Sequence, residues 1–425
     1  MRDDATTTGS ASKSDALIDG GPECAGPIGN VIFTLLDRAM RRRHIGRLRL
    51  TLPSGAASII GDPSQPFGPE IEVRSFRALW KIARRGSLGF AEAYMDGDIH
   101  TPDLRAVFEY YLANDAAMTG LFPRLIVTHR ADRRFHERRR NTVTGSRRNI
   151  ADHYDLGNAF YCLWLDPSML YSSGIYHSRD TTLEDAQRHK IDRIIDALAI
   201  EKGDTVLEIG CGWGAFAEAA ANAGGDVRAI TISEQQLLAA RARIAAAGLS
   251  DRVEICFEDY RDTSGTFDRL VSIEMIEAVG EENWPLFFET IANRLSPGGT
   301  AAIQAITIRE DAFEQYRENP DFIQRYIFPG GMLPTVEQMR LRAIAANLSF
   351  ETIERFGGSY ATTLAEWRHR FLAAWPAIER LGFNERFKRM WLYYLIYCEI
   401  GFERGWIDVG LYRMRKPAAS PVWLS

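Results

Sequence analysis

Between residues 206 and 308 the chain alternates short apolar runs with longer stretches that have helical spacing of apolar residues. Short apolar runs bounded by turn residues are typical of strands that are buried in a sheet. Strand and helix in regular alternation predict a doubly wound parallel sheet, which is an α/β fold. A Ser-Pro-Gly-Gly turn is expected before the last strand. The predicted strands are 206–209, 227–232, 253–257, 270–273 and 300–308, and the predicted helices are 215–223, 234–247 and 284–295.

The part of the chain before residue 125 has a mixed pattern instead. Segments 47–52 and 71–74 read as strands, and the first of them ends at a Pro-Ser-Gly turn. Segments 77–84, 88–94 and 103–112 have the apolar spacing of helices. This part is therefore predicted to form a smaller α+β unit.

A chain of 425 residues, of which 46% are hydrophobic and 25% charged, has the balance of a globular protein with about two to three domains. Residues 1–29 are rich in Gly, Ser, Thr and Asp and are predicted to be a disordered tail. An N-terminal accessory domain is expected at 30–128, a basic linker at 129–149 and the catalytic domain at 150–417.

The basic linker carries most of the uneven charge in the chain. Between residues 130 and 148 there are eight arginines against Asp132 and Glu137, so the segment is +6 in a chain with a net charge of −5. Such a run suits nucleic acid, an anionic lipid surface or an acidic partner, and a solvated linker is an equally good interpretation.

The cysteines and the N-terminal residues indicate the cellular compartment in which the protein is expected. The five cysteines are widely spaced and contain no CxxC pair, which fits a reducing environment and gives no metal-ligand pattern. The first 15 residues are polar and do not resemble a secretory signal. No stretch approaches the roughly 18–20 apolar residues that cross a bilayer. We therefore expect a cytoplasmic protein that meets a membrane only at its surface.

A glycine-rich loop lies where the first strand of the predicted sheet meets the first helix (VLEIGCGWG, 206–214). Gly210, Gly212 and Gly214 allow a tight turn and the close approach of a ligand. The loop lacks the GK[ST] of a phosphate-binding P-loop, and its GxGxG spacing differs from the GxGxxG of dinucleotide sites. Glu208 precedes the glycines, where a carboxylate repels pyrophosphate but suits the α-amino group of S-adenosylmethionine. The alternative is a glycine turn without a ligand.

Asp259 and Tyr260 follow the third strand, and ligands of doubly wound sheets bind outside the carboxyl ends of the strands. Asp259 is therefore predicted to accept a hydrogen bond from the adenine amino group, the alternative being a solvated loop acid. Cys211, inside the glycine loop, is interpreted as a small buried residue of the cofactor site and not as a nucleophile.

Several segments resemble the cyclopropane-fatty-acyl-phospholipid synthase family, which includes the mycolic acid cyclopropane synthases. The resemblance runs from about residue 75 to 415, and residues 88–97 (LGFAEAYMDG) resemble the accessory domain of the bacterial phospholipid enzymes. It implies a Rossmann-like class I S-adenosylmethionine-dependent methyltransferase domain. The other motifs are 150–161 (IADHYDLGNAFY), 165–174 (LDPSMLYSSG), 206–214, 231–236 (TISEQQ), 268–280 (DRLVSIEMIEAVG), 326–334 (YIFPGGMLP) and 356–367.

The resemblance implies a reaction and a set of site residues. An alkene in an acyl chain attacks the methyl group of S-adenosylmethionine, which leaves a carbocation that aromatic faces stabilise. A bound bicarbonate then removes a proton. The cofactor residues carried over are Tyr171, Ser172, Glu208, Gly210, Cys211, Gly212, Gly214, Thr231, Ser233, Gln236, Asp259 and Tyr260, and the residues around the base are Ser173, Glu277, Gln304, Ile306 and Tyr360.

Two positions depart from the family pattern. Ser173 stands where the family has a cysteine, and Gln304 where it has a histidine. Both can hydrogen-bond an anion, but neither supplies the positive charge of a protonated histidine, so bicarbonate is expected to be held less tightly. The departures bear on the product. Ring closure to a cyclopropane is predicted first, and a C-methyltransferase that leaves a methyl or methylene branch is the alternative.

Three further features of the sequence also have simpler structural interpretations. His153, Tyr154 and Asp155 are interpreted as part of a lid and not as catalytic groups. Aromatic residues crowd 316–328 and 391–397, where they form either core or the lining of an acyl channel. The expected partners are unsaturated phospholipid acyl chains and the anionic inner membrane surface, with no nucleic acid. A homodimer is expected by analogy with the bacterial family, and a silent module that only binds S-adenosylmethionine or lipid is the alternative to an enzyme.

Overall fold

The computed structural model describes residues 34, 45–61, 67–114 and 156–418. Its contacts divide the chain into two compact units, one of Met1–Trp80 and Gly97–Phe122 and the other of Lys81–Asp96 and Pro123–Ser425. Within the described residues, no helix combines the length and the apolar character needed to cross a membrane.

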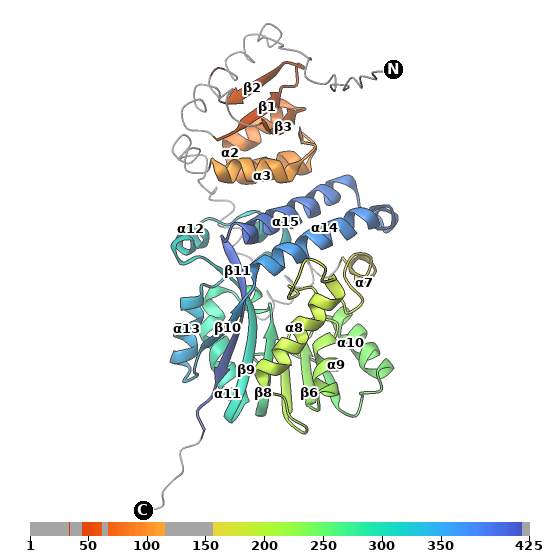
Figure 1. The fold of residues 1–425 in the computed structure, drawn as a ribbon, viewed down its shortest axis with the longest axis vertical. Helices are drawn as coiled ribbons and strands as arrows, with labels where there is room; N and C mark the ends of the chain where they lie inside the picture. Colours follow the sequence, from red (N-terminus) through yellow and green to blue (C-terminus); the bar gives the residue numbers. More distant parts are fainter. Residues whose placement is uncertain (1–33, 35–44, 62–66, 115–155, 419–425) are drawn as a thin grey trace, which may run out of the picture. The chain divides into compact units, whose positions relative to one another are not determined.

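The first unit contains a four-stranded sheet in the order β2-β1-β3-β4 (Figure 1). The predicted strands and the helix near residue 103 are confirmed, whereas β2 was not predicted. Asp103 begins α3 because its side chain accepts a hydrogen bond from the Ala106 N–H at 3.0 Å. The elements are β1 (Arg47–Thr51), β2 (Ala57–Gly61), β3 (Phe67–Val73), β4 (Ile99–His100) and α3 (Leu104–Ala113).

The second unit is built on a seven-stranded sheet in the order β10-β11-β9-β8-β5-β6-β7. The five predicted strands pair in parallel, which confirms the doubly wound sheet, and β10 and β11 add an antiparallel edge. The strands are β5 (Thr205–Ile209), β6 (Asp226–Thr231), β7 (Val253–Phe257), β8 (Phe267–Ile273), β9 (Leu295–Ile308), β10 (Glu351–Arg355) and β11 (Ile407–Arg415).

The turn predicted before the fifth strand is wrong in one respect, because residues 296–299 lie within β9. Phe267 pairs with Leu295 and Arg269 with Thr300, so the Ser-Pro-Gly-Gly segment is an irregularity in the ladder. Gly298 adopts a φ of 82°, and its N–H donates to the Lys416 carbonyl at 3.2 Å. This contact with the C-terminal segment lets the strand continue through residues that favour a turn.

Helices cover both faces of the large sheet (Figure 1). α8, α9 and α10 lie on one face and α11 and α13 on the other, while α14 and α15 pack against each other across one end. Side-chain caps at Thr182, Ser233, Thr335 and Asn384 begin four of these helices. The helices are α8 (Leu183–Leu198), α9 (Ala215–Asn222), α10 (Glu234–Ala246), α11 (Trp284–Arg294), α12 (Phe313–Glu318), α13 (Val336–Ala345), α14 (Gly357–Arg380) and α15 (Glu385–Glu403), with α7 (Asn158–Tyr161), η2 (Ile276–Ala278), η3 (Glu281–Asn283), η4 (Glu310–Ala312) and the π-helix η5 (Ile323–Ile327) as shorter pieces.

Residues 81–96 belong to the second unit, although the sequence analysis placed them in the N-terminal domain. α2 (Phe76–Met95) breaks at Gly86, where φ is 55° and ψ is −127°. The break lets the helix fold back so closely that a Cβ at Gly89 would lie 2.0 Å from the Lys81 carbonyl oxygen. The two predicted helical segments on either side of the glycine are thereby confirmed.

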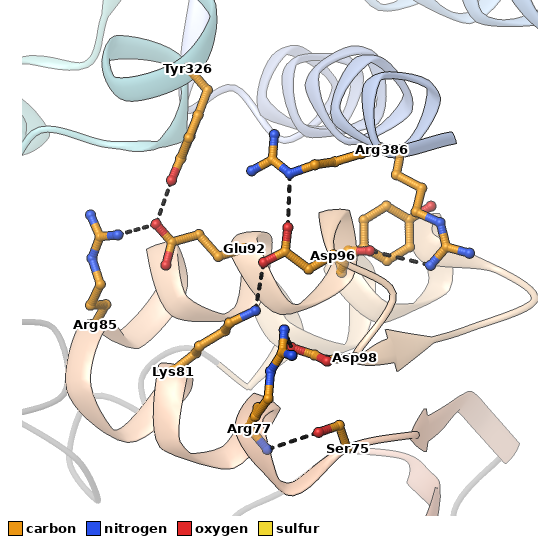
Figure 2. A network of polar contacts seen from close by, with 11 residues as sticks. Ser75, Arg77, Lys81, Arg85, Glu92, Asp96, Asp98, Tyr326 and Arg386 are labelled. Atoms are coloured by element: carbon orange, nitrogen blue, oxygen red, sulfur yellow. Dashed lines mark hydrogen bonds and ion pairs between the residues drawn. The ribbon is translucent and has the colours of Figure 1, made fainter. Parts of the chain in front are cut away.

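Two carboxylates tie this folded segment to the catalytic unit (Figure 2). Glu92 accepts hydrogen bonds from Arg85 and from the Tyr326 hydroxyl of η5. Asp96 accepts from Lys81 at 2.6 Å and from Arg386 of α15 at 2.8 Å. The contacts explain why a segment that precedes the linker in sequence packs with the large sheet unit.

Glu92→Ala is expected to loosen residues 87–95, because it removes the carboxylate that accepts from the partly buried Arg85 and from the Tyr326 hydroxyl. Loss of hydrogen bonds to a charged group costs about 1–3 kcal/mol, which corresponds to amide exchange about 5 to 150 times faster. Hydrogen–deuterium exchange measures this. The control is Glu385→Ala, since Glu385 is 59% exposed in its pair with Arg389 and its loss costs at most about 1 kcal/mol. Equal exchange in both variants would contradict the role of Glu92.

Candidate active site

The glycine loop lies at the carboxyl end of β5, at the edge where doubly wound sheets bind ligands. The N–H groups of Gly210 and Cys211 both donate to the Ile230 carbonyl at 3.0 Å, which fixes the loop to β6. Gly210 and Gly214 have φ angles of 85° and 83°, which side chains rarely adopt. The loop therefore lies fixed between the end of β5 and the first turn of α9, where the sequence predicted it.

Glu208 is the one carboxylate beside this loop on β5, and it is 3% exposed. Its Oε2 is buried and has no hydrogen-bond partner among the described residues. Burial raises the pKa of Glu208 to about 8. A buried carboxyl oxygen without a donor fits an alkylammonium group, whose charge would favour the ionised carboxylate, so Glu208 suits the α-amino group of S-adenosylmethionine.

Glu208→Gln is expected to weaken S-adenosylmethionine binding about 10- to 100-fold, because a charge-assisted hydrogen bond contributes about 1.5–3 kcal/mol. Isothermal titration calorimetry measures the dissociation constant. The matched control is Glu218→Gln on α9. Its carboxylate pairs with Arg243 and is not expected to contact the cofactor. Unchanged affinity in the Glu208 variant would remove this residue from the cofactor site.

The second strand of the site presents a small polar network. The Thr231 hydroxyl donates to the Gln236 side-chain oxygen at 3.0 Å and accepts from the Ser233 N–H at 3.2 Å. Ser233 in turn caps α10 by accepting from the Gln236 N–H. All three side chains are buried, so the structure brings these predicted cofactor residues together at the end of β6.

Asp259 follows β7, at the carboxyl ends of the strands as predicted, and its carboxylate forms an ion pair with Arg261. Arg261 donates from Nε to Oδ1 at 2.8 Å and from a terminal nitrogen to Oδ2 at 2.7 Å. A bidentate guanidinium compensates the burial of this carboxylate. An adenine contact would have to use the remaining lone pairs. The neighbouring Tyr260 hydroxyl is buried and has no partner in the described part of the chain.

Tyr171 and Ser172 approach the site from the loop before α8. The Tyr171 hydroxyl is 2.9 Å from the Tyr394 hydroxyl of α15, and the Ser172 hydroxyl accepts a hydrogen bond from Lys190 of α8 at 2.7 Å. The loop is thus fixed from two helices. Cys211 is buried, and burial raises the pKa of its thiol, which agrees with a packing role.

The predicted bicarbonate residues surround a carboxylate of the protein itself. Glu274 follows β8, and its Oε1 accepts from the Ser173 N–H at 2.9 Å and from the Gln304 side-chain amide at 2.7 Å. Its Oε2 accepts from the Tyr360 hydroxyl at 2.7 Å. Three of the residues assigned to an anion therefore do bind an anion, and that anion is Glu274. The Ser173 hydroxyl itself donates to the Gly174 carbonyl.

Glu277 and Ile306 form the other predicted contact at the site. The Ile306 N–H donates to Glu277 Oε1 at 2.5 Å, while Oε2 is buried and has no partner among the described residues. Burial, and then the charge of Glu274, raises the pKa of Glu277 to about 8. Burial also raises the pKa of Glu274, but its three donors and the charge of Lys190 oppose that rise. Carboxylates in such different surroundings take different protonation states, with Glu274 the better candidate for the ionised base.

Sequence reasoning missed Glu274 because the resemblance matched a single glutamate in this motif, Glu277. The sequence did contain an indication of its role. Glu274 comes directly after β8, which is the parallel neighbour of the β5 strand that carries Glu208. Its φ of 48° lies in the left-handed region, which a non-glycine residue adopts at some cost. Three hydrogen bonds to the carboxylate hold it there.

Aromatic rings pack around these polar groups. Tyr360 stacks on Phe402 with centroids 4.4 Å apart, and Tyr171 lies 5.2 Å from Trp367. Phe328 lies 6.1 Å from Tyr394, so the two predicted aromatic clusters do meet. Other members belong to the core, as the alternative interpretation held: Trp391 is 1% exposed among Phe160, Trp164 and Phe387.

Two features singled out in the sequence lie outside the described residues. They are the arginine-rich run between 130 and 148 and the triplet His153, Tyr154 and Asp155. The interpretations of both remain predictions.

Comparison with known proteins gives the site its context. A model of the mycolic acid cyclopropane synthetase family matches residues 141–411. Tuberculostearic acid methyltransferase UfaA1 of Mycobacterium tuberculosis is 37% identical over 402 residues, which cover 90% of this chain and 91% of the relative. Cyclopropane-fatty-acyl-phospholipid synthase of Escherichia coli is 35% identical over 340 residues, covering 78% and 84%.

A solved structure supports the same conclusion. Mycolic acid cyclopropane synthase CmaA1, complexed with S-adenosylhomocysteine and CTAB, superposes with a TM-score of 0.59 at 28% identity and covers 64% of this chain and 98% of that one. The predicted class I methyltransferase fold is therefore confirmed, and S-adenosylmethionine is the cofactor.

Proposed function

The chain belongs to the mycolic acid cyclopropane synthetase family of S-adenosylmethionine-dependent methyltransferases, and from that premise we propose that it methylates the double bond of an unsaturated fatty acyl chain and leaves an acyclic branch. The product is a methylene-bearing or methyl-branched unsaturated chain. The observation that supports this choice is the Glu274 carboxylate, held by Ser173, Gln304 and Tyr360.

The chemistry needs one methyl donor and one base. S-adenosylmethionine supplies an electrophilic methyl group and leaves as S-adenosylhomocysteine. The alkene supplies the electron pair of the new carbon–carbon bond, and the neighbouring carbon becomes a cation. Loss of a proton from the new methyl group with bond formation to the cation closes a ring. Loss of a proton from an adjacent carbon, or from the methyl group after a hydride shift, leaves an alkene instead.

Glu274 supports the acyclic outcome because it takes the donors that the resemblance assigns to bicarbonate. A tethered carboxylate removes a proton from one direction, fixed by its three hydrogen bonds. Bicarbonate is a small separate anion that does not share this constraint. With the donors of Ser173, Gln304 and Tyr360 engaged, we infer that this enzyme uses its own carboxylate as the base.

The aromatic residues fit the cation. Tyr360, Phe402, Trp367 and Tyr171 pack around the same end of the sheet, and aromatic faces stabilise a desolvated cation by about 2 kcal/mol or more. Water would quench a carbocation, and the site has a lining in which Tyr360, Trp367 and Tyr394 are buried.

The acceptor we propose is an acyl chain of a membrane phospholipid, met at the anionic inner membrane surface. Support comes from the names of the relatives, which include a tuberculostearic acid methyltransferase and a cyclopropane-fatty-acyl-phospholipid synthase. The arginine-rich segment between 130 and 148 suits such a surface, where each basic residue adds about 1 kcal/mol.

Ring closure, which the sequence analysis put first, is the second candidate. The family description and the Escherichia coli relative favour it. The relative with the higher identity is named a methyltransferase, which favours the acyclic product.

The proposal is tested with vesicles of monounsaturated phospholipid and S-adenosylmethionine labelled in the methyl group. We expect label in the fatty acid fraction after the lipid is hydrolysed, and none in the released headgroup. Label confined to the headgroup, or no transfer at all, would contradict an acyl methyltransferase.

A further inference from the structure

Lys190 is a buried cation that neither the sequence analysis nor the proposed reaction assigns. It lies on α8 and is 0% exposed. A buried ammonium is costly unless an anion compensates it. The groups around Lys190 therefore indicate which anion compensates its charge.

The ammonium reaches the loop that carries the site residues. Lys190 Nζ donates to the Ser172 hydroxyl at 2.7 Å, and Gln187, one turn earlier on α8, donates to the Ser172 carbonyl at 2.8 Å. The next residue, Ser173, donates its N–H to Glu274. Lys190 therefore contacts the Ser172–Ser173 segment, whose Ser173 N–H binds the Glu274 carboxylate.

Two carboxylates lie near enough to act on Lys190. Burial lowers its pKa to about 8, while the charges of Glu274 and Asp166 oppose that change. In return, the Lys190 charge lowers the pKa of Glu274. The titratable groups facing Glu274 are Glu277 of η2, Tyr360 of α14 and Lys190 of α8. Among these described groups Lys190 alone carries a positive charge.

We propose that Lys190 is a positioning residue whose ammonium keeps Glu274 in its carboxylate form within a site that excludes water. The inference rests on the proposed role of Glu274 as base. Without the cation, burial favours the neutral acid, which cannot take a proton from the methylated chain. Through Ser172, the same ammonium also fixes the peptide that donates to Glu274.

The test compares Lys190→Met with the wild-type enzyme over a range of pH. Formation of the methylated acyl product is measured at saturating S-adenosylmethionine and phospholipid vesicles. Because removal of the cation raises the pKa of Glu274, the acid limb of the profile is expected to move to higher pH by about 1 unit or more. Affinity for S-adenosylmethionine is expected to change by less than about threefold, since Glu208 is intact and Gln187 still donates to the Ser172 carbonyl.

Two further variants complete the design. Arg188→Met removes an exposed arginine of the same helix that pairs with Asp185, and its profile is expected to match the wild type. Lys190→Gln keeps a donor for Ser172 without the charge, and it serves where the methionine variant does not fold. Near-ultraviolet circular dichroism identifies folded variants.

The inference is overturned if both Lys190 variants have the wild-type acid limb, whatever their maximal rate. It is also overturned if they lose cofactor affinity while the limb stays in place, because Lys190 would then serve the cofactor. The proposed function fails by a different readout, the structure of the wild-type product. A ring-closed product together with a shifted acid limb would contradict the proposed function and still support the role of Lys190.

Discussion

Glu274→Gln is expected to lower the rate of acyl product formation about a thousandfold, within the 10²- to 10⁴-fold range of general-base catalysis. The amide keeps the shape of the side chain. Its oxygen, in the place of Oε1, can still accept from the Ser173 N–H, and its NH2 group, in the place of Oε2, can donate to the Tyr360 oxygen. It has no basic site for the proton of the methylated chain. S-adenosylmethionine binding is expected to remain close to the wild-type value because Glu208, the predicted contact of its α-amino group, is unchanged.

The control is the neighbouring glutamate. Burial raises the pKa of Glu277 to about 8, so at neutral pH its acid form dominates, and an amide resembles that form. Its Oε1 accepts from Ile306, as an amide oxygen also can. Glu277→Gln is therefore expected to cost no more than about tenfold in rate, below the range of a lost general base. A larger loss in the Glu277 variant than in the Glu274 variant would exchange the two roles.

Glu274→Gly is expected to create a binding place for bicarbonate. The residue already has a φ of 48°, which glycine adopts without strain, and its removal leaves three donors with no acceptor. Added bicarbonate is expected to raise the rate of this variant about 10- to 100-fold, which is less than the 10²- to 10⁴-fold contribution of a general base because the anion is not tethered. The ring-closed fraction of the product is expected to rise with it.

Glu274→Gln is the matched control for this rescue, because its side chain still fills the place. Rates are measured with and without bicarbonate at constant pH and ionic strength, and the acyl products are separated by gas chromatography. Equal stimulation of the two variants would mean that bicarbonate acts elsewhere. No stimulation of the glycine variant would mean that the three donors do not form an anion site.

The large sheet could be predicted from sequence because its strands are buried on both faces, so that each is an apolar run bounded by turns. The antiparallel edge was missed. β10 (ETIER) is exposed or half-buried along its length, and its pattern gives little contrast with a loop. The contacts group residues 81–96 with the large sheet unit, which the sequence pattern does not indicate because their partners, Tyr326 and Arg386, lie far away in sequence.

The sequence pointed to several side chains that the structure brings together, and their roles toward cofactor and base remain predictions. Ser173, Gln304 and Tyr360 converge as the resemblance implied, but the anion between them is a side chain that the motif did not mark. Lys190 was missed for a related reason. Lysine side chains are almost always exposed. Only the packed structure therefore identifies Lys190 of α8 as buried.

The structure of the wild-type product shows directly whether this family member leaves an acyclic branch. The enzyme is supplied with S-adenosylmethionine carrying a trideuterated methyl group and with monounsaturated phospholipid vesicles, and the fatty acids are analysed by mass spectrometry and proton NMR. We predict an olefinic branched chain, with two retained deuteriums for a methylene product or three for a methyl branch beside an internal double bond. A product with two retained deuteriums and upfield cyclopropane ring protons would contradict the proposed acyclic product.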